Sequence, residues 1–168
     1  APTTPAPTTP APTTPAPTTP TQTTPPAGGD SVGTQVYKRA LKSTALISTG
    51  EGRGTGFLID ESKRLLVTAY HVVEEVEEIW VIFPEFKPDG SVITEYSHYF
   101  RDNVQPNTVR GKVVFRIKSK DLALVQIDTI PTGFKTLQLS EKRATPGEKT
   151  YTLGNPGSSG GMWIFSEG

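Results

Sequence analysis

Short apolar runs separated by turn residues make up the chain from about Thr34 onward. Alternating apolar and polar positions are typical of half-buried strands, and short continuous apolar runs are typical of buried ones. The pattern predicts strands near 43–48, 55–59, 64–69, 79–83, 91–95, 109–117, 121–127, 136–139, 149–153 and 162–165. Many short strands at close spacing favour an all-β sandwich or barrel over alternating strands and helices.

Two polar segments support this all-β interpretation. Asp60 to Lys63 separates two apolar runs, and Pro88-Asp89-Gly90 predicts a hairpin turn between 80–83 and 92–93. The one helical candidate is Val72 to Glu78, where valines recur at helical spacing among glutamates.

The segment 109–117 predicts a half-buried strand with a basic outer face. Val109, Val113, Phe115 and Ile117 share one parity, whereas the other parity carries Arg110, Lys112 and Arg116. We interpret this basic face and the glutamates after His71 as solvated surfaces.

The first 29 residues contain only Pro, Thr, Ala, Gly and Gln22, and Ala1-Pro2-Thr3-Thr4-Pro5 recurs from Ala6, Ala11 and Ala16. Such a segment has no apolar side chains to bury and favours an extended polyproline helix. Stalks of this composition are often O-glycosylated. We therefore predict a disordered Pro/Thr-rich repeat linker over 1–33 and a folded domain over 34–168. The linker indicates a spacer in an extracytoplasmic setting (periplasmic, cell-envelope or secreted), and a linker with no role beyond its length is the alternative.

The overall composition excludes several classes of protein. The chain has 17 basic and 17 acidic residues and no cysteine. Without cysteine there is no disulfide scaffold, no thiolate zinc site and no cysteine nucleophile. A neutral balance argues against a nucleic-acid partner, and no apolar run reaches the ~18 residues of a membrane span.

The candidate chemistry begins with the two histidines. His98 lies in a turn-rich excursion and is interpreted as an ordinary surface or loop residue. His71 follows the apolar run 65–69 at a predicted strand-to-helix junction, which suits a general base that titrates near neutrality. Alternatives are a structural histidine, or a metal ligand together with Glu74 or Glu75, which would need a third ligand and lacks a known motif.

Asp121 begins the apolar run 121–127, and a carboxylate at the start of a buried strand needs a partner. A hydrogen bond from a histidine Nδ1–H would satisfy it and fix the tautomer of the ring. The alternative is a surface aspartate that follows the turn 118–120 and pairs with a lysine.

Four motifs in order resemble the trypsin-like serine proteases, and in particular the bacterial high-temperature-requirement type. They are Gly54-Thr55-Gly56-Phe57-Leu58-Ile59-Asp60, Thr68-Ala69-Tyr70-His71-Val72-Val73, Asp121-Leu122-Ala123-Leu124, and the segment from Pro146-Gly147 to Gly154-Asn155-Pro156. The resemblance covers roughly residues 36–168, with a variable excursion at 84–107. It implies a double β-barrel in which His71 and Asp121 belong to a Ser-His-Asp triad that cleaves peptide bonds through an acyl-enzyme. Polypeptide substrates are the implied partners, and no cofactor or metal is implied.

The family's nucleophile should stand in Gly-x-Ser-Gly-Gly, and Ser159 in Gly157-Ser158-Ser159-Gly160-Gly161 matches this pattern. However, the family places its serine roughly ninety residues beyond the aspartate, and Ser159 comes only 159 − 121 = 38 residues after it. We therefore expect the chain to hold the first barrel and the opening strands of the second, with the nucleophile beyond Gly168. The fragment is then expected to be inactive. A pseudoprotease used as a binding module and a stalked β-rich adhesion domain are the alternatives.

Overall fold

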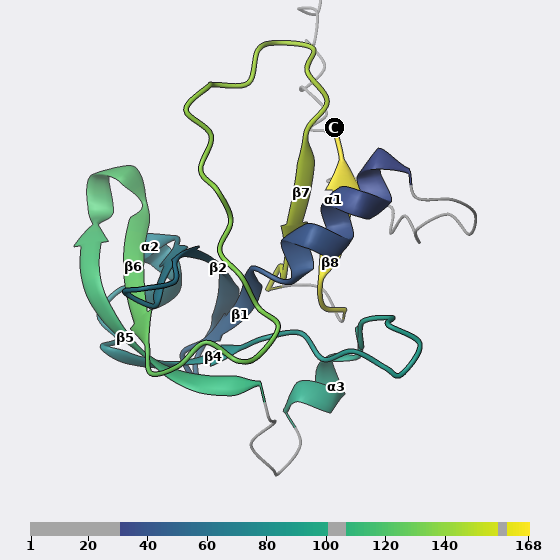
Figure 1. The fold of residues 1–168 in the computed structure, drawn as a ribbon. Coiled ribbons are helices and arrows are strands. Elements are labelled where there is room, and N and C mark those ends of the chain that lie inside the picture. The colour runs from purple at the N-terminus through teal and green to yellow at the C-terminus, as the bar shows by residue number, and fades with distance from the viewer. Residues whose placement is uncertain (1–30, 101–106, 158–160) are drawn as a thin grey trace, which may run out of the picture.

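Six antiparallel strands close into a barrel in the computed structural model, which describes residues 31–100, 107–157 and 161–168 (Figure 1). The strands are β1 (Thr44–Ser48), β2 (Arg53–Asp60), β3 (Leu65–Thr68), β4 (Glu78–Ile82), β5 (Thr108–Ile117) and β6 (Leu122–Ile127). Their order around the barrel is β1-β2-β3-β6-β5-β4. The predicted all-β fold class is confirmed.

The barrel encloses a core of side chains from all six strands. Its members include Ile47, Leu58, Leu66, Val81, Val113 and Val125. Two glycines let the strands approach closely, since a Cβ on Gly111 would lie 2.7 Å from Cγ1 of Val125 and a Cβ on Gly56 would lie 3.0 Å from Cδ1 of Ile47. Each fully buried aliphatic side chain contributes about 1.5–3 kcal/mol through the hydrophobic effect.

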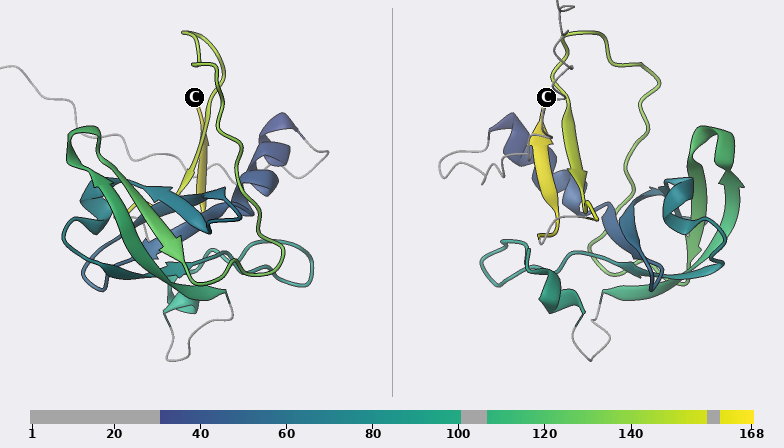
Figure 2. Two further views of the ribbon diagram at one scale, coloured as in Figure 1. Left: turned by 60° about the vertical axis from the view of Figure 1, so that its left-hand side comes forward. Right: turned by 180° about the vertical axis from the view of Figure 1, so that it is seen from behind.

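A second, smaller unit lies against the outside of the barrel. It consists of helix α1 (Val32–Leu41) and a two-stranded antiparallel sheet of β7 (Tyr151–Gly154) and β8 (Ile164–Glu167) (Figure 2). Ser31 begins the helix by accepting a hydrogen bond from the backbone N–H of Thr34. A second apolar cluster joins this unit to β1 and β4 and contains Leu41, Leu46, Ile82, Tyr99, Met162 and Trp163.

Three short helical turns complete the described structure: α2 (Tyr70–Val73), α3 (Tyr96–Tyr99) and η1 (Lys118–Lys120). Within the described residues, no helix has the length and apolar character needed to cross a membrane.

Several predicted elements are wrong. The predicted helix at 72–78 ends at Val73, because Glu74 takes φ 23° and ψ −105°, and Glu78 already belongs to β4. The segment 136–139 forms no strand and contacts the barrel through the Leu137 N–H, which donates to the Leu58 carbonyl.

The predicted hairpin at Pro88-Asp89-Gly90 forms a turn without a paired strand. The predicted strand 91–95 is replaced by isolated bridges, in which Val92 pairs with Phe86 and Glu95 pairs with Gly161. The segment then continues into α3. The turn predicted between Asp60 and Lys63 is confirmed, and Asp60 Oδ1 accepts hydrogen bonds from the Lys63 N–H and the Ser62 hydroxyl.

The predicted inner face of 109–117 is correct at Val109 and Val113, which are buried, and wrong at Phe115, which is 53% exposed. The cause is a register shift against β6 between Val113 and Phe115, which changes the parity of the strand.

Candidate active site

The pairing of β3 with β6 brings His71 and Asp121 to the same end of the barrel. The two strands are antiparallel, and Thr68 at the end of β3 faces Ala123 near the start of β6. The chain leaves β3 directly into α2, which carries His71, and enters β6 directly from Asp121. Two residues 50 positions apart in the sequence therefore become neighbours.

Both carboxylate oxygens of Asp121 contact His71. The backbone N–H of His71 donates to Oδ1 at 2.9 Å, and Nδ1 of the ring lies 2.8 Å from Oδ2. Asp121 has a left-handed backbone (φ 51°, ψ 46°), a conformation that aspartate tolerates better than most residues. The carboxylate thus meets the backbone and the side chain of His71 at once, which fixes the orientation of the ring.

These contacts lower the pKa of Asp121 below its ordinary value. The largest cause is the hydrogen bond from the His71 backbone N–H, followed by the bond to the His71 ring and the charge interaction with it, while partial desolvation opposes them. The side chains of His71 and Asp121 are 68% and 52% exposed. The sequence predicted that Asp121 stands at the start of a buried strand, but its side chain is half-exposed at the end of the barrel. The predicted contact between Asp121 and Nδ1 of His71 is present.

A glycine on β2 sets the position of α2. Gly54 lies against Val72, the residue that follows His71, and a Cβ at position 54 would lie 2.7 Å from Val72 Cγ1. Gly54 belongs to the motif Gly54-Thr55-Gly56 that resembles the family, and the close approach of Val72 is the physical reason for a glycine there.

Ser159, the predicted match to the nucleophile motif, lies outside the described residues. The residues on either side are well anchored. Arg53 Nη2 donates to the Gly157 carbonyl at 2.9 Å, and Asn155 accepts a hydrogen bond from the Trp163 N–H through Oδ1 at 2.8 Å. The Asn155 N–H in turn donates to the Thr55 hydroxyl on β2. The segment that contains the predicted Gly-Asn-Pro motif is thus tied to the strand that supports α2.

His98 lies in α3, away from this pair. Its Nε2 atom is 2.9 Å from Glu85 Oε2, and its side chain is 29% exposed. Among the residues that the structure describes, no group of three His, Asp or Glu side chains is placed to hold a metal ion, the neighbours of His71 included.

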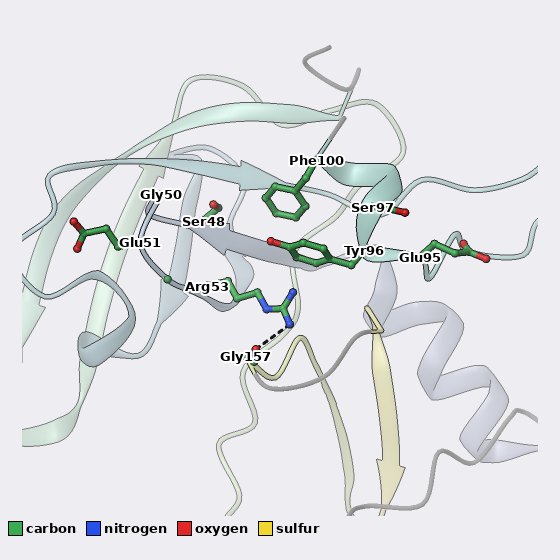
Figure 3. Close-up of a pocket in the computed structure, with 10 residues that line it drawn as sticks. Ser48, Gly50, Glu51, Arg53, Glu95, Tyr96, Ser97, Phe100 and Gly157 are labelled. Carbon is green, nitrogen blue, oxygen red and sulfur yellow. Dashed lines mark hydrogen bonds between the residues drawn. The ribbon is translucent and has the colours of Figure 1, made fainter. Parts of the chain in front are cut away.

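Sequence reasoning missed a hollow beside the turn between β1 and β2, with a volume of about 1090 Å³ (Figure 3). Arg53, Tyr96 and Phe100 line it together with parts of the β1–β2 turn. No sequence signal marks it, because the aromatic residues come from an excursion more than forty positions later than the turn.

The closed six-strand barrel, with a histidine and an aspartate joined at one end, is the arrangement of one half of the trypsin-like peptidase fold. A family model described as "Trypsin-like peptidase domain" matches residues 54–168, and the chain belongs to this family. Protease Do-like 8, chloroplastic, of Arabidopsis thaliana is 28% identical over 117 residues, which are 69% of this chain and 24% of the relative. The predicted resemblance to trypsin-like proteases of the high-temperature-requirement (Do-like) type is thereby confirmed.

Solved structures of bacterial proteases share the fold. The serine endoprotease from Yersinia pestis gives a TM-score of 0.59 at 16% identity, covering 83% of this chain and 44% of that one. The inactive form of the Rv3671c protease gives a TM-score of 0.54 at 23% identity, and the match covers 78% of this chain and 52% of that one. A mutant of the same protein from M. tuberculosis H37Rv, also in an inactive form, gives a TM-score of 0.56 at 23% identity, and the match covers 79% of this chain and 51% of that one. The chain spans about a quarter of the length of the curated relative and about half of the length of these structures.

Proposed function

We propose that the protein is a serine endopeptidase in which His71 is the general base and Asp121 holds it in place. The observation that supports this most strongly is the double contact between the two residues, at 2.9 and 2.8 Å. When Nδ1 donates its proton to Asp121, the neutral ring keeps a lone pair on Nε2, which is the atom that accepts a proton from a serine hydroxyl.

In this mechanism His71 moves a proton twice during each half of the reaction. Nε2 accepts the hydroxyl proton while the serine oxygen attacks the scissile carbonyl, and it then gives that proton to the leaving amine as the acyl-enzyme forms. A water molecule repeats the sequence and releases the acid. Asp121 stabilises the imidazolium that exists between these transfers, and its lowered pKa keeps it ionised at neutral pH. Backbone N–H groups of a Gly-x-Ser-Gly-Gly loop would hold the oxyanion.

We further propose that the nucleophile is a serine beyond Gly168 in the natural protein that contains this chain, and that the chain alone does not hydrolyse peptides. The spacing supports this proposal, since only β6 and β7 are described between Asp121 and Gly157. The family's double barrel would need further strands before its nucleophile. The relatives, which are much longer than this chain, are consistent with it.

Labelling with a fluorophosphonate probe tests the proposal, because the probe reacts only with a serine that a base has activated. The chain of 168 residues is expected to remain unlabelled, and the natural protein that contains it is expected to label in a manner that requires His71. Labelling of the chain that is lost on Ser159→Ala, but kept in the matched variant Ser166→Ala, would make Ser159 the nucleophile and overturn our assignment. A natural protein that neither labels nor cleaves would instead be a binding module with the peptidase fold.

A further inference from the structure

A groove of about 680 Å³ lies between α1 and the segment 136–142, which follows the barrel in the chain. It is lined by Arg39 of α1 and by every residue of that segment. Neither His71 nor Asp121 lines the groove, so it is separate from the candidate active site. Its volume is in the range of ligand sites in proteins, and it is large enough for a short stretch of extended polypeptide.

Two backbone hydrogen bonds hold the start of the segment in place. The Lys135 N–H donates at 2.9 Å to the carbonyl of Lys42, the residue that follows α1. The Leu137 N–H donates at 2.8 Å to the carbonyl of Leu58 on β2. The segment is thus tied both to the end of α1 and to the barrel. The groove is formed before any ligand arrives, which lowers the entropic cost of binding.

The same segment has backbone N–H groups without a partner. Thr136 lies between the two donors and Gln138 follows them, and neither N–H donates to another group in the described part of the chain. Donation by residues 135 and 137 is the pattern of an extended chain, in which successive N–H groups point to opposite sides. The N–H groups of Thr136 and Gln138 are therefore expected on the side that an incoming extended polypeptide can reach.

The groove carries an excess of positive charge, although the chain as a whole is neutral. Arg39 and Lys142 line it, against the single carboxylate of Glu141. Lys42 and Lys135 adjoin it through their backbone hydrogen bond, and all four basic residues are exposed. None of the four forms an ion pair with another described residue. Their charges are thus available to an acidic ligand.

Unpaired backbone donors beside unpaired positive charges determine which ligand fits the groove. An acidic polypeptide satisfies both features, because its backbone carbonyls accept from the segment while its carboxylates interact with the guanidinium and ammonium groups. A nucleic acid or an anionic lipid surface would use the charges alone and would leave the N–H groups of Thr136 and Gln138 unpaired.

We propose that this groove binds an acidic segment of a partner polypeptide in an extended conformation. The backbone of the partner pairs with Thr136 and Gln138, and its glutamate or aspartate side chains lie near Arg39 and Lys142. Leu139, which is 63% exposed and also lines the groove, provides an apolar contact. This binding goes beyond the proposed peptidase function and does not depend on it.

Binding is tested with the full 168-residue chain, labelled with ¹⁵N, and two blocked nonapeptides. The acidic probe is Gly-Ser-Thr-Glu-Thr-Glu-Thr-Ser-Gly, and the matched basic probe carries Lys in place of both glutamates. The acidic probe is expected to shift the backbone amide signals of Thr136, Gln138 and Leu139, and to bind more weakly as salt rises. The basic probe is expected to cause no such shifts. Equal binding of both probes, or binding of neither, would overturn the proposal.

Two N-methylated forms of the acidic probe test the pairing of the backbones. One form carries N-methyl groups on both glutamates, and the other carries them on the first two threonines. Because only alternate N–H groups of a paired strand face its neighbour, one form is expected to bind about tenfold more weakly while the other keeps its Kd. Equal Kd values for the two forms would contradict the pairing. A thymidine trinucleotide, which carries two phosphates, should bind more weakly than the acidic probe, and equal binding would make the groove a general anion site.

Charge variants locate the site on the chain. The double change Arg39→Gln and Lys142→Gln is expected to raise the Kd for the acidic probe about tenfold, the effect of losing two partly exposed ion pairs. The matched double change Lys87→Gln and Lys112→Gln alters the net charge equally, at exposed positions that do not line the groove, and should change the Kd less than about twofold. Equal effects of the two double changes would show that the probe responds to net charge alone, and would overturn the assignment of the site.

Discussion

Gly54 and Val72 are packed so closely that the position of α2, the helix that carries His71, depends on the absence of a Cβ atom at position 54. A Cβ on Gly54 would lie 2.7 Å from Cγ1 of Val72 and 3.1 Å from its Cβ. Val72 follows His71 in α2, a helix of only four residues. A shift of Val72 would therefore move His71, while Asp121 is held separately at the start of β6.

Gly54→Ala is expected to lower the free energy of unfolding by about 1–3 kcal/mol, the usual cost of overpacking. It should also alter the ring signals of His71, since α2 must move to admit the new methyl group. Urea unfolding and NMR spectra measure the two effects. The control is Gly52→Ala, where a Cβ would lie 3.7 Å from the nearest atom, Oγ1 of Thr49, and which should change the stability little. Equal effects of the two substitutions would show that the contact with Val72 is unimportant.

The contact between Asp121 and His71 predicts the tautomer of the neutral ring. His71 should carry its proton on Nδ1, because Oδ2 of Asp121 lies 2.8 Å away and accepts it. Long-range ¹H–¹⁵N NMR spectra distinguish the two tautomers, and His98 provides an internal comparison. In Asp121→Ala the His71 proton should move to Nε2, the preferred position in a free imidazole. A wild-type ring protonated on Nε2 would contradict the proposed orientation.

Asp121 should also make stability depend on pH in the acidic range. Its pKa is lower in the folded state than the ordinary value of ~3.9. Its contribution to stability is therefore fully present above that ordinary value and is lost as the pH falls through the lower, folded-state pKa. A ¹³C NMR titration of the carboxyl group measures the pKa directly.

His71→Ala should raise the Asp121 pKa only part of the way to its ordinary value, because the backbone N–H of residue 71, the largest cause of the shift, remains in the variant. An ordinary pKa in the wild type, or no change in His71→Ala, would refute this explanation.

Tyr99 joins the excursion after β4 to the sheet of β7 and β8. Its hydroxyl accepts hydrogen bonds from the Glu85 N–H and from Nε1 of the buried Trp163, both at 3.0 Å, and donates to the Ile93 carbonyl. Tyr99→Phe would leave the indole N–H of Trp163 without this acceptor, and should lower the free energy of unfolding by about 1–3 kcal/mol. Urea unfolding monitored by tryptophan fluorescence is the measurement.

The matched change for Tyr99→Phe is Tyr151→Phe, at a half-buried ring stacked on Phe165. This substitution should cost less than about 0.5 kcal/mol. A comparable loss of stability in the two variants would argue that the Tyr99 hydroxyl has no special role in joining the two units.

The all-β class could be predicted from the sequence because the strands are short apolar runs separated by turn signals, as at Asp60 to Lys63, whereas the barrel itself was implied by the family resemblance. Outside the barrel, the strands predicted near 149–153 and 162–165 are present as β7 and β8, each shifted by one or two residues, whereas α1 could not be predicted. The helix α1 contains Gly33 and several β-branched residues, which weaken its helical pattern, and it is stabilised by packing of Tyr37 and Leu41 in the second cluster. The segment 136–139 is apolar enough for a strand, but its backbone contact with Leu58 does not extend into a ladder.

The neighbouring positions of His71 and Asp121 could be predicted because each residue lies next to an apolar run in the sequence. His71 follows β3 and Asp121 precedes β6, and the pairing of these two strands brings the residues together. The exposure of Asp121 could not be predicted from its neighbours, because β6 begins at the rim of the barrel with Leu122 also 43% exposed. The hollow lined by Arg53, Tyr96 and Phe100 depends on the path of an irregular excursion, for which sequence periodicity gives no information.

The role proposed for His71 is best tested by hydrolysis of fluorescein-labelled casein, measured with a form of the protein that includes the proposed nucleophile. His71→Ala is expected to lower kcat/KM by at least about 10⁴-fold, as for loss of the base in a serine peptidase. His98→Gln, which changes the other histidine in the chain, is the control and should keep activity within a few-fold of the wild type. Activity of the His71→Ala protein within tenfold of the wild type would contradict the claim that His71 is the general base.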